Sequence, residues 1–212
     1  MTVFSSKLGL AAIAAMGLVS GVNAATITWG SAFSITSASD ISNAGSHFLA
    51  DSMGGGTPTV NGVVFSDVLD PGPFFDANLW ATPTGDAGLD DILDSHDNFA
   101  GPNGPYTQTL TGLTPGVLYQ VQYIAVHDLR GCCSTRVSTL GDGNGNQTGP
   151  SFTRSTGGSA IGTFTADGST QLIEVYGDTD PGIAGLIVRT VPEPGSLALL
   201  GLGGLALGRR RR

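Results

Sequence analysis

The sequence predicts an all-β protein, a single antiparallel β-sandwich of jelly-roll type, between an N-terminal signal peptide and a short C-terminal apolar helix. Three observations support this prediction. Short alternating or β-branched stretches recur along the chain, turn signals separate them, and few stretches have helical periodicity. Short strands with frequent turns are typical of antiparallel sandwiches. We find no internal repeat, and we expect one domain over residues 25–190.

The expected strands begin directly after the signal peptide. In chain order they are residues 25–29, 60–65, 117–126, 161–166, 172–176 and 183–188. The third is the clearest, because the odd-numbered residues from Val117 to Ala125 are apolar and share one face. Pro-Gly and Asp-Gly pairs mark the intervening turns. The only helices that we expect are short, near residues 39–46 and 89–93.

The first 24 residues have the three parts of a secretory signal peptide. Lys7 lies in a short charged region, an apolar run follows from Leu8 to Val19, and Val22 and Ala24 supply the small residues of a cleavage site. The apolar run is shorter than the ~20 residues that a membrane-spanning helix needs. We therefore expect signal peptidase to cleave after Ala24 rather than the segment to remain as an anchor.

Residues 191–212 form a tail with three parts, namely a proline motif, an apolar run from Ser196 to Gly208, and an arginine cluster. The run is short for a bilayer core of ~30 Å, and the positive-inside rule would keep the arginines on the cytoplasmic side. We therefore expect transient membrane insertion and weak anchoring. The motif and cluster residues are Pro192, Glu193, Pro194, Arg209, Arg210, Arg211 and Arg212.

This tail resembles the PEP-CTERM sorting signal of bacteria that make exopolysaccharide. Its three parts occur in the order of that signal, although Gly195 stands where the family often has Ser and the apolar run is short. The resemblance implies export, processing by an exosortase, and a place in the cell envelope, at the cell surface or outside the cell. Three segments of the body also resemble exported PEP-CTERM β-sandwich proteins without an established activity: residues 59–65, 113–136 and 161–168.

Removal of both ends would leave a strongly acidic domain. Residues 25–191 contain four arginines, no lysine and 16 acidic residues, a net charge of −12. Such a surface repels nucleic acid and anionic lipid, so we expect no nucleic-acid partner. Glu174 is the only glutamate of this part, so the carboxylate pair of a glycosidase would have to come from aspartates.

Asp128, Arg130 and Arg136 follow the clearest strand and have two interpretations. An arginine there can bind a carboxylate or a sugar hydroxyl through its planar fork. Alternatively, Asp128 and an arginine form an ion pair that fixes a loop, as acids beside arginines in loops usually do. Trp80 is a candidate for stacking on a sugar ring, although aromatic residues in sandwiches more often belong to the core.

Cys132 and Cys133 are adjacent and are the only cysteines. In an oxidising compartment we expect a local disulfide between them, and pairing with another chain is the alternative. The adjacent Ser95, His96 and Asp97 are the residue types of a hydrolase triad. Because adjacent residues point in different directions, we expect them to belong to a polar loop.

Calcium is the metal that the acid-rich loops favour, and we expect no other cofactor. Residues 142–146 are similar to the first half of an EF-hand loop, but Gln147 and Thr153 stand where glycine and glutamate are required. Solvated acidic loops without a metal are the alternative. The calcium candidates are Asp86, Asp90, Asp91 and Asp142.

Together these observations predict an exported, non-catalytic protein of the envelope or exopolysaccharide, with polysaccharide as its candidate ligand. Two alternatives stay open: a secreted carbohydrate-active hydrolase, and a purely structural surface protein. A concave face lined by aromatic residues with Asp and Arg would favour binding. A uniform surface of Ser and Thr would favour the structural protein.

Overall fold

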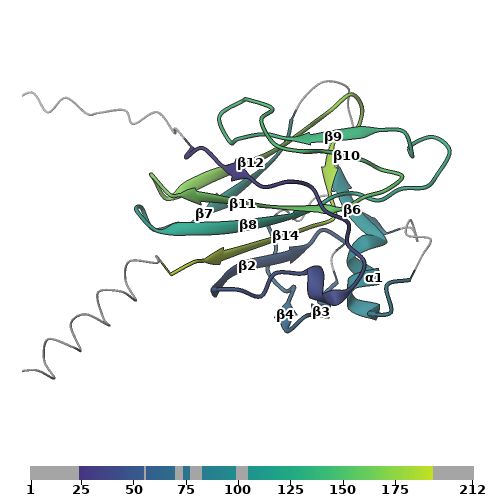
Figure 1. Ribbon diagram of the computed structural model, residues 1–212, viewed down its shortest axis with the longest axis horizontal. Helices are drawn as coiled ribbons and strands as arrows, with labels where there is room; N and C mark the ends of the chain where they lie inside the picture. The colour runs from purple at the N-terminus through teal and green to yellow at the C-terminus, as the bar shows by residue number, and fades with distance from the viewer. Residues whose placement is uncertain (1–23, 55, 70–73, 77–82, 99–104, 193–212) are drawn as a thin grey trace, which may run out of the picture.

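The computed structural model describes residues 24–54, 56–69, 74–76, 83–98 and 105–192. In these ranges the chain is mostly β-structure, with one short α-helix, α1 (Ala87–Leu93), and a 3-10 turn, η1 (Ala38–Asp40). All named strand pairs are antiparallel, so the expected β-rich, antiparallel architecture is confirmed (Figure 1). The expected signal peptide and the apolar part of the tail lie outside these ranges.

Two larger sheets form the body of the structure. The first has five strands in the order β1-β11-β8-β14-β2, and the second has four in the order β10-β9-β12-β7. The five strands are β1 (Thr28–Trp29), β11 (Ser159–Thr165), β8 (Leu118–Ile124), β14 (Gly185–Thr190) and β2 (Ser46–Ser52). The four strands are β10 (Ser151–Thr153), β9 (Val137–Leu140), β12 (Thr170–Gly177) and β7 (Tyr106–Thr111).

Two smaller sheets complete the described strands. One has three strands, β13 (Gly182–Ile183), β6 (Ser95–Asn98) and β5 (Phe74–Asp76), and the other is the hairpin of β3 (Thr59–Val60) and β4 (Val63–Val64). Within the described ranges no helix has both the length and the apolar character needed to cross a membrane.

One hydrophobic core joins the two larger sheets. Alternate residues of β8 point into it, and Tyr119, Val121 and Tyr123 are each at most 2% exposed. Ile173 and Val175 of β12 meet them from the other sheet. The alternation that the sequence predicts for this strand is therefore confirmed, and its apolar face lies between two layers.

The outer face of the five-stranded sheet is also covered. A second cluster places Leu89 and Ile92 of α1 and Phe65, just after β4, against Ile124 and Ile187 of the sheet. The outer face of the four-stranded sheet differs, because outward threonines alternate along β7 with buried side chains and are exposed. Of the two larger sheets, the four-stranded one thus presents an outer face to solvent.

The structure differs from the sequence prediction at several segments. The helix expected near residues 39–46 is reduced to η1, and β2, β7, β9 and β10 are strands that the sequence pattern did not indicate. Pairing with β14 over six residue pairs supplies the strand geometry of β2, so a tertiary contact overrides the local pattern. Ser95 to Asp97, expected in a polar loop, belong to β6 and are at most 7% exposed.

Candidate functional site

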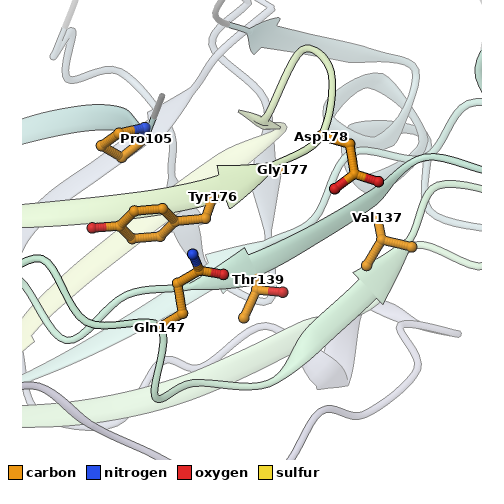
Figure 2. A pocket seen from close by; sticks show the side chains of 7 residues that line it. All are labelled: Pro105, Val137, Thr139, Gln147, Tyr176, Gly177 and Asp178. Carbon is orange, nitrogen blue, oxygen red and sulfur yellow. The ribbon is translucent and has the colours of Figure 1, made fainter. Parts of the chain in front are cut away.

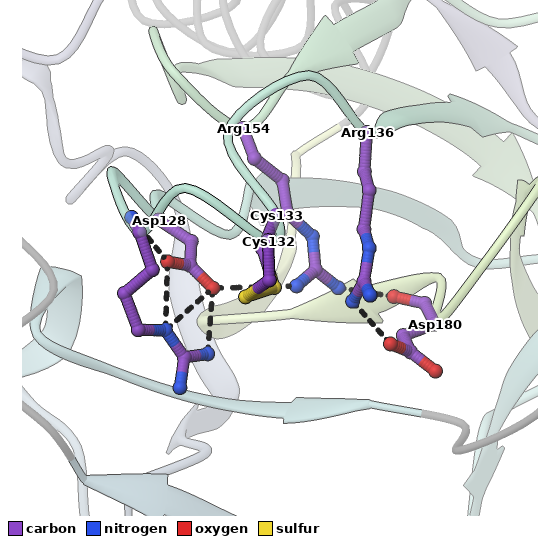
Figure 3. The surroundings of a disulfide bond; sticks show 7 residues. Asp128, Cys132, Cys133, Arg136, Arg154 and Asp180 are labelled. Carbon is purple, nitrogen blue, oxygen red and sulfur yellow. Dashed lines mark hydrogen bonds and ion pairs between the residues drawn. A yellow bond between two sulfur atoms is a disulfide. The ribbon is translucent and has the colours of Figure 1, made fainter.

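Asp128 lies at the centre of an ion-pair network rather than on a surface (Figure 3). Its side chain has no exposed area. The Nε and Nη2 atoms of Arg130 donate to the two carboxylate oxygens at 3.0 and 2.7 Å. Burial alone would raise the pKa of Asp128, but the hydrogen bonds and charge of Arg130, with the charge of Arg154, hold that pKa below its ordinary value.

Arg154 connects this pair to a second one. Its side chain is 2% exposed, with Nη1 3.7 Å from Asp128 Oδ2 and Nη2 donating to the carbonyl of Asp180. Arg136 Nη1 donates to the carboxylate of Asp180. The sequence analysis offered two interpretations, ligand binding or a structural role, for Asp128, Arg130 and Arg136. In the structure all three form ion pairs with other residues of the protein. That geometry matches the structural interpretation.

A disulfide joins Cys132 to Cys133 beside this network (Figure 3). Cys132 is exposed, whereas Cys133 is 4% exposed. The amides of Cys133 and Ser134 both donate to the carbonyl of Arg130, which forms a tight turn, and the amide of Ser155 donates to the carbonyl of Ser134. The loop that precedes β9 is therefore held by the disulfide, the backbone and the ion pairs together.

His96, the middle residue of the Ser95-His96-Asp97 segment in β6, lies close enough to this network to be affected by its charges. Burial lowers the pKa of His96 to about 4, and the positive charge of Arg154 acts in the same direction. Ser95 Oγ donates to the carbonyl of Asp91 at 3.0 Å, and Tyr106 Oη donates to Asp97 at 2.7 Å. Ser95 and Asp97 thus each have a hydrogen-bond partner outside the Ser-His-Asp segment.

The calcium candidates have structural contacts of their own. Asp86 caps α1 by accepting from the amide of Leu89, and Asp90 accepts from the amide and hydroxyl of Thr84. Asp142 accepts from two amides of its own loop, while Asp91 is an exposed residue of α1. Among the residues that the structure describes, no three His, Cys, Asp or Glu side chains are grouped to hold a metal ion.

A hollow lies on the outer face of the four-stranded sheet, with a volume of about 360 Å³ (Figure 2). We call it the Tyr176 hollow. It is lined by Pro105, Val137, Thr139, Gln147, Tyr176, Gly177 and Asp178.

Strand register assembles the floor of the Tyr176 hollow. Tyr176 of β12 lies directly opposite Thr139 of β9, and Thr139 lies opposite Ser151 of β10. The hydroxyls of Thr139 and Ser151 are hydrogen-bonded at 2.7 Å. Directly paired residues share a face of the sheet. The Tyr176 ring and the hydroxyls of Thr139 and Ser151 therefore form a row across β12, β9 and β10.

A loop packed against Glu174 forms one wall of the hollow. The amide of Gly145 donates to Glu174 Oε2 at 3.0 Å, and Glu174 is 6% exposed. Gly141 is needed at this contact, because a Cβ there would lie 2.7 Å from the Tyr176 ring. Burial raises the pKa of Tyr176, and the Glu174 carboxylate adds to the effect. This packing fixes the ring and brings Gln147 to the rim.

The rim of the Tyr176 hollow carries two polar side chains available to a ligand. Asp178 and Gln147 are exposed. Neither hydrogen-bonds nor pairs with another side chain within the described part of the chain, in contrast to Asp128 and Asp180. The arrangement therefore offers a fixed ring, a free carboxylate and a free amide around one concave surface.

The sequence pattern does not indicate this site. It predicts a strand that contains Tyr176, and alternation with buried Ile173 and Val175 places Tyr176 on the outer face. Pro192 lies in a described, exposed position after β14. The remaining predicted site residues lie outside the described ranges: Trp80, Glu193, Pro194, Arg209, Arg210, Arg211 and Arg212.

Comparison with known protein families identifies the C-terminal tail. The PEP-CTERM protein-sorting motif matches residues 190–212, which include the proline motif and the arginine cluster. No curated protein and no solved structure matches the chain.

Proposed function

We propose that the folded domain is a non-catalytic polysaccharide-binding module of the cell envelope or exopolysaccharide. The PEP-CTERM sorting motif of the chain implies that the protein is an exported substrate of an exosortase. In this proposal signal peptidase removes residues 1–24, and residues 25–190 form the binding domain. The observation that carries the proposal is the Tyr176 hollow on the outer face of the four-stranded sheet.

The strand order supports a single jelly roll as the scaffold. When β2, β7, β8, β9, β10, β11, β12 and β14 are numbered one to eight along the chain, the five-stranded sheet contains the order 1-8-3-6. The four-stranded sheet then has the order 2-7-4-5. Two interlocked Greek keys produce this order, which is that of a double-sheet jelly roll.

The chemistry of the hollow suits a sugar. A fixed aromatic ring such as Tyr176 can stack on the apolar face of a pyranose, while the amide of Gln147 and the carboxylate of Asp178 can bind its hydroxyls. The volume of about 360 Å³ falls within the range of roughly 300–1,000 Å³ that small-ligand sites occupy. An open face also allows a polymer to extend beyond the hollow.

The position of Glu174 supports a non-catalytic role. This only glutamate of residues 25–191 is buried and accepts from the amide of Gly145, so it holds a loop. A glycosidase needs two carboxyl groups that reach the scissile bond. In the Tyr176 hollow Asp178 is the single carboxyl-bearing lining residue among those described, which favours binding over hydrolysis.

A purely structural surface protein is the second candidate function. The observation that favours it is β7, whose outward residues Thr107, Thr109 and Thr111 form a uniform exposed row of hydroxyls. In that case the outer face would be solvated and would bind no ligand.

The test is binding of the exported, processed protein to an array of bacterial polysaccharides, with calcium and again with chelator. We expect binding to one class of glycan, reduced about ten-fold or more by Tyr176→Ala, since stacking and packing of one ring contribute about 1.5 kcal/mol or more. Thr109→Ala, on the same face but outside the hollow, is the matched control. Loss of binding with chelator would assign calcium to the site, and absence of binding in both conditions would favour the structural protein.

A further inference from the structure

The described lining of the Tyr176 hollow carries a negative charge. Among the residues that the structure describes, seven line the hollow, and Asp178 is the single charged one of these. Arg136 and Arg154, on the nearby loops, donate to the carboxylate and the carbonyl of Asp180. A ligand in the hollow therefore meets a carboxylate that no described cation neutralises.

Further negative charge acts on the Tyr176 ring. The carboxylates of Glu174 and Asp142 both act on Tyr176 and raise the pKa of its phenol beyond the effect of burial. Their negative potential and the electron-rich face of the ring have the same sign. A ligand with a positive charge is thus attracted by the ring, by Asp178 and by the carboxylates of Glu174 and Asp142.

The charge of the whole domain also favours positively charged ligands. Residues 25–191 carry a net charge of −12, which steers cationic polymers toward the protein and repels anionic ones. Long-range attraction of this kind does not choose a site, and it weakens as salt is added. Selection requires a local contact, and the free carboxylate on the rim supplies one.

We propose that the Tyr176 hollow selects polysaccharides with free, protonated amino groups, as in a glucosamine polymer, over neutral and acidic polysaccharides. In this arrangement the ammonium group of one sugar donates to Asp178 while the same or the next sugar stacks on Tyr176. The inference rests on the proposed function of the hollow and adds the chemical class of its ligand.

The test compares three oligosaccharides of equal length by calorimetry: a glucosamine oligomer, its fully N-acetylated counterpart, and an oligogalacturonate. The protein is the exported, processed chain, at a pH where the amine is protonated. We expect the glucosamine oligomer to bind about ten-fold tighter than the N-acetylated one, since a hydrogen bond to a charged group contributes about 1.5–3 kcal/mol. Oligogalacturonate should bind weakest.

Two variants with the same change in charge locate the contact. Asp178→Asn should remove most of the preference for the free amine. Asp167→Asn should keep it, because Asp167 is exposed in the turn between β11 and β12, before the start of the strand that ends in the hollow. Equal loss in both variants would mean non-specific attraction and would overturn the inference.

The remaining outcomes separate the inference from the proposed function. Equal affinity for the glucosamine and N-acetylated oligomers, both lost in Tyr176→Ala, would overturn the amine preference and leave the sugar site intact. Tighter binding of oligogalacturonate would do the same. Failure of all three oligomers and of the polysaccharide array would overturn the proposed function itself.

Discussion

The guanidinium of Arg154 lies 3.7 Å from the carboxylate of Asp128, and the two side chains are 2% and 0% exposed. Arg154 belongs to the segment after β10 and Asp128 to the segment after β8, so this pair joins two loops at one end of the sheets. A buried charge that loses its partner destabilises the folded state, because it has neither hydration nor an opposite charge to compensate it. The loops that surround the disulfide therefore depend on the charge state of Asp128.

Asp128→Asn should destabilise the protein strongly. The variant keeps the size of the side chain but leaves Arg154 buried without its carboxylate, and loss of one member of a buried pair costs about 3–5 kcal/mol. We expect the free energy of unfolding, measured in urea, to fall by this amount. Asp167→Asn removes the same charge from an exposed turn, and its effect should stay within about 0.5 kcal/mol. Similar losses in both variants would contradict the role of the buried pair.

The stability of the protein should fall as the pH drops from 6.5 to about 4, because of His96. Burial, with the charge of Arg154, lowers the pKa of this imidazole from 6.5 to about 4. Between these values the unfolded chain binds a proton that the folded protein does not, so stability is complete above the window and decreases through it. The loss from this group is on the order of 3 kcal/mol.

Unfolding in urea at a series of pH values checks this prediction, with His96→Gln as the test variant. The variant should be less dependent on pH in that window, whatever its stability at neutral pH. Asp128 adds a separate loss of stability at lower pH, because its pKa in the folded protein lies below the ordinary value of 3.8. Its contribution to stability is complete above pH 3.8 and disappears as the pH falls through the lowered pKa. Parallel pH profiles of variant and natural protein would exclude His96 as the cause.

Removal of the Cys132–Cys133 disulfide should have a small effect on stability. The bond closes a ring across adjacent residues, so it restricts the unfolded chain little, and the chain-entropy relation gives about 1 kcal/mol for so short a loop. We expect the double Cys→Ser variant to unfold with a free energy lower by about this amount and to keep glycan binding. Mass spectrometry of the exported protein without reductant should show both thiols oxidised within one chain. Disulfide-linked dimers on a non-reducing gel would instead support pairing between chains.

Local sequence signals predicted the features that depend on neighbours in the chain. The alternation that buries Tyr119 and Tyr123 is visible in the sequence, and the Asp128–Arg130 pair lies between residues two apart. In each case the interacting groups lie close together in sequence, so spacing alone carries the geometry.

The Tyr176 hollow could not be predicted in this way, because distant segments build it. The pairing of β12 with β9 places Thr139 beside Tyr176, and the packing of a loop on Glu174 brings Gln147 to the rim. Arg154 is equally distant in sequence from Asp128. Register and loop packing set these contacts, and a single sequence contains no signal for either.

Replacement of Pro192, Glu193 and Pro194 by alanine in the full chain should block sorting without altering the folded domain. The match over residues 190–212 includes this tripeptide, and β14, the last strand within the described residues, ends at Thr190 before it. We expect the variant to keep its tail and to accumulate with the membrane fraction, whereas the natural protein reaches the cell envelope or surface. The mass of the C-terminal peptide, read in both fractions, measures processing.

Gly195→Ser is the matched control, because it changes the residue beside the motif toward the one that the family often has, and its processing should be unchanged. Normal processing of the alanine variant would show that the exosortase recognises the apolar run and the arginines rather than the prolines and glutamate.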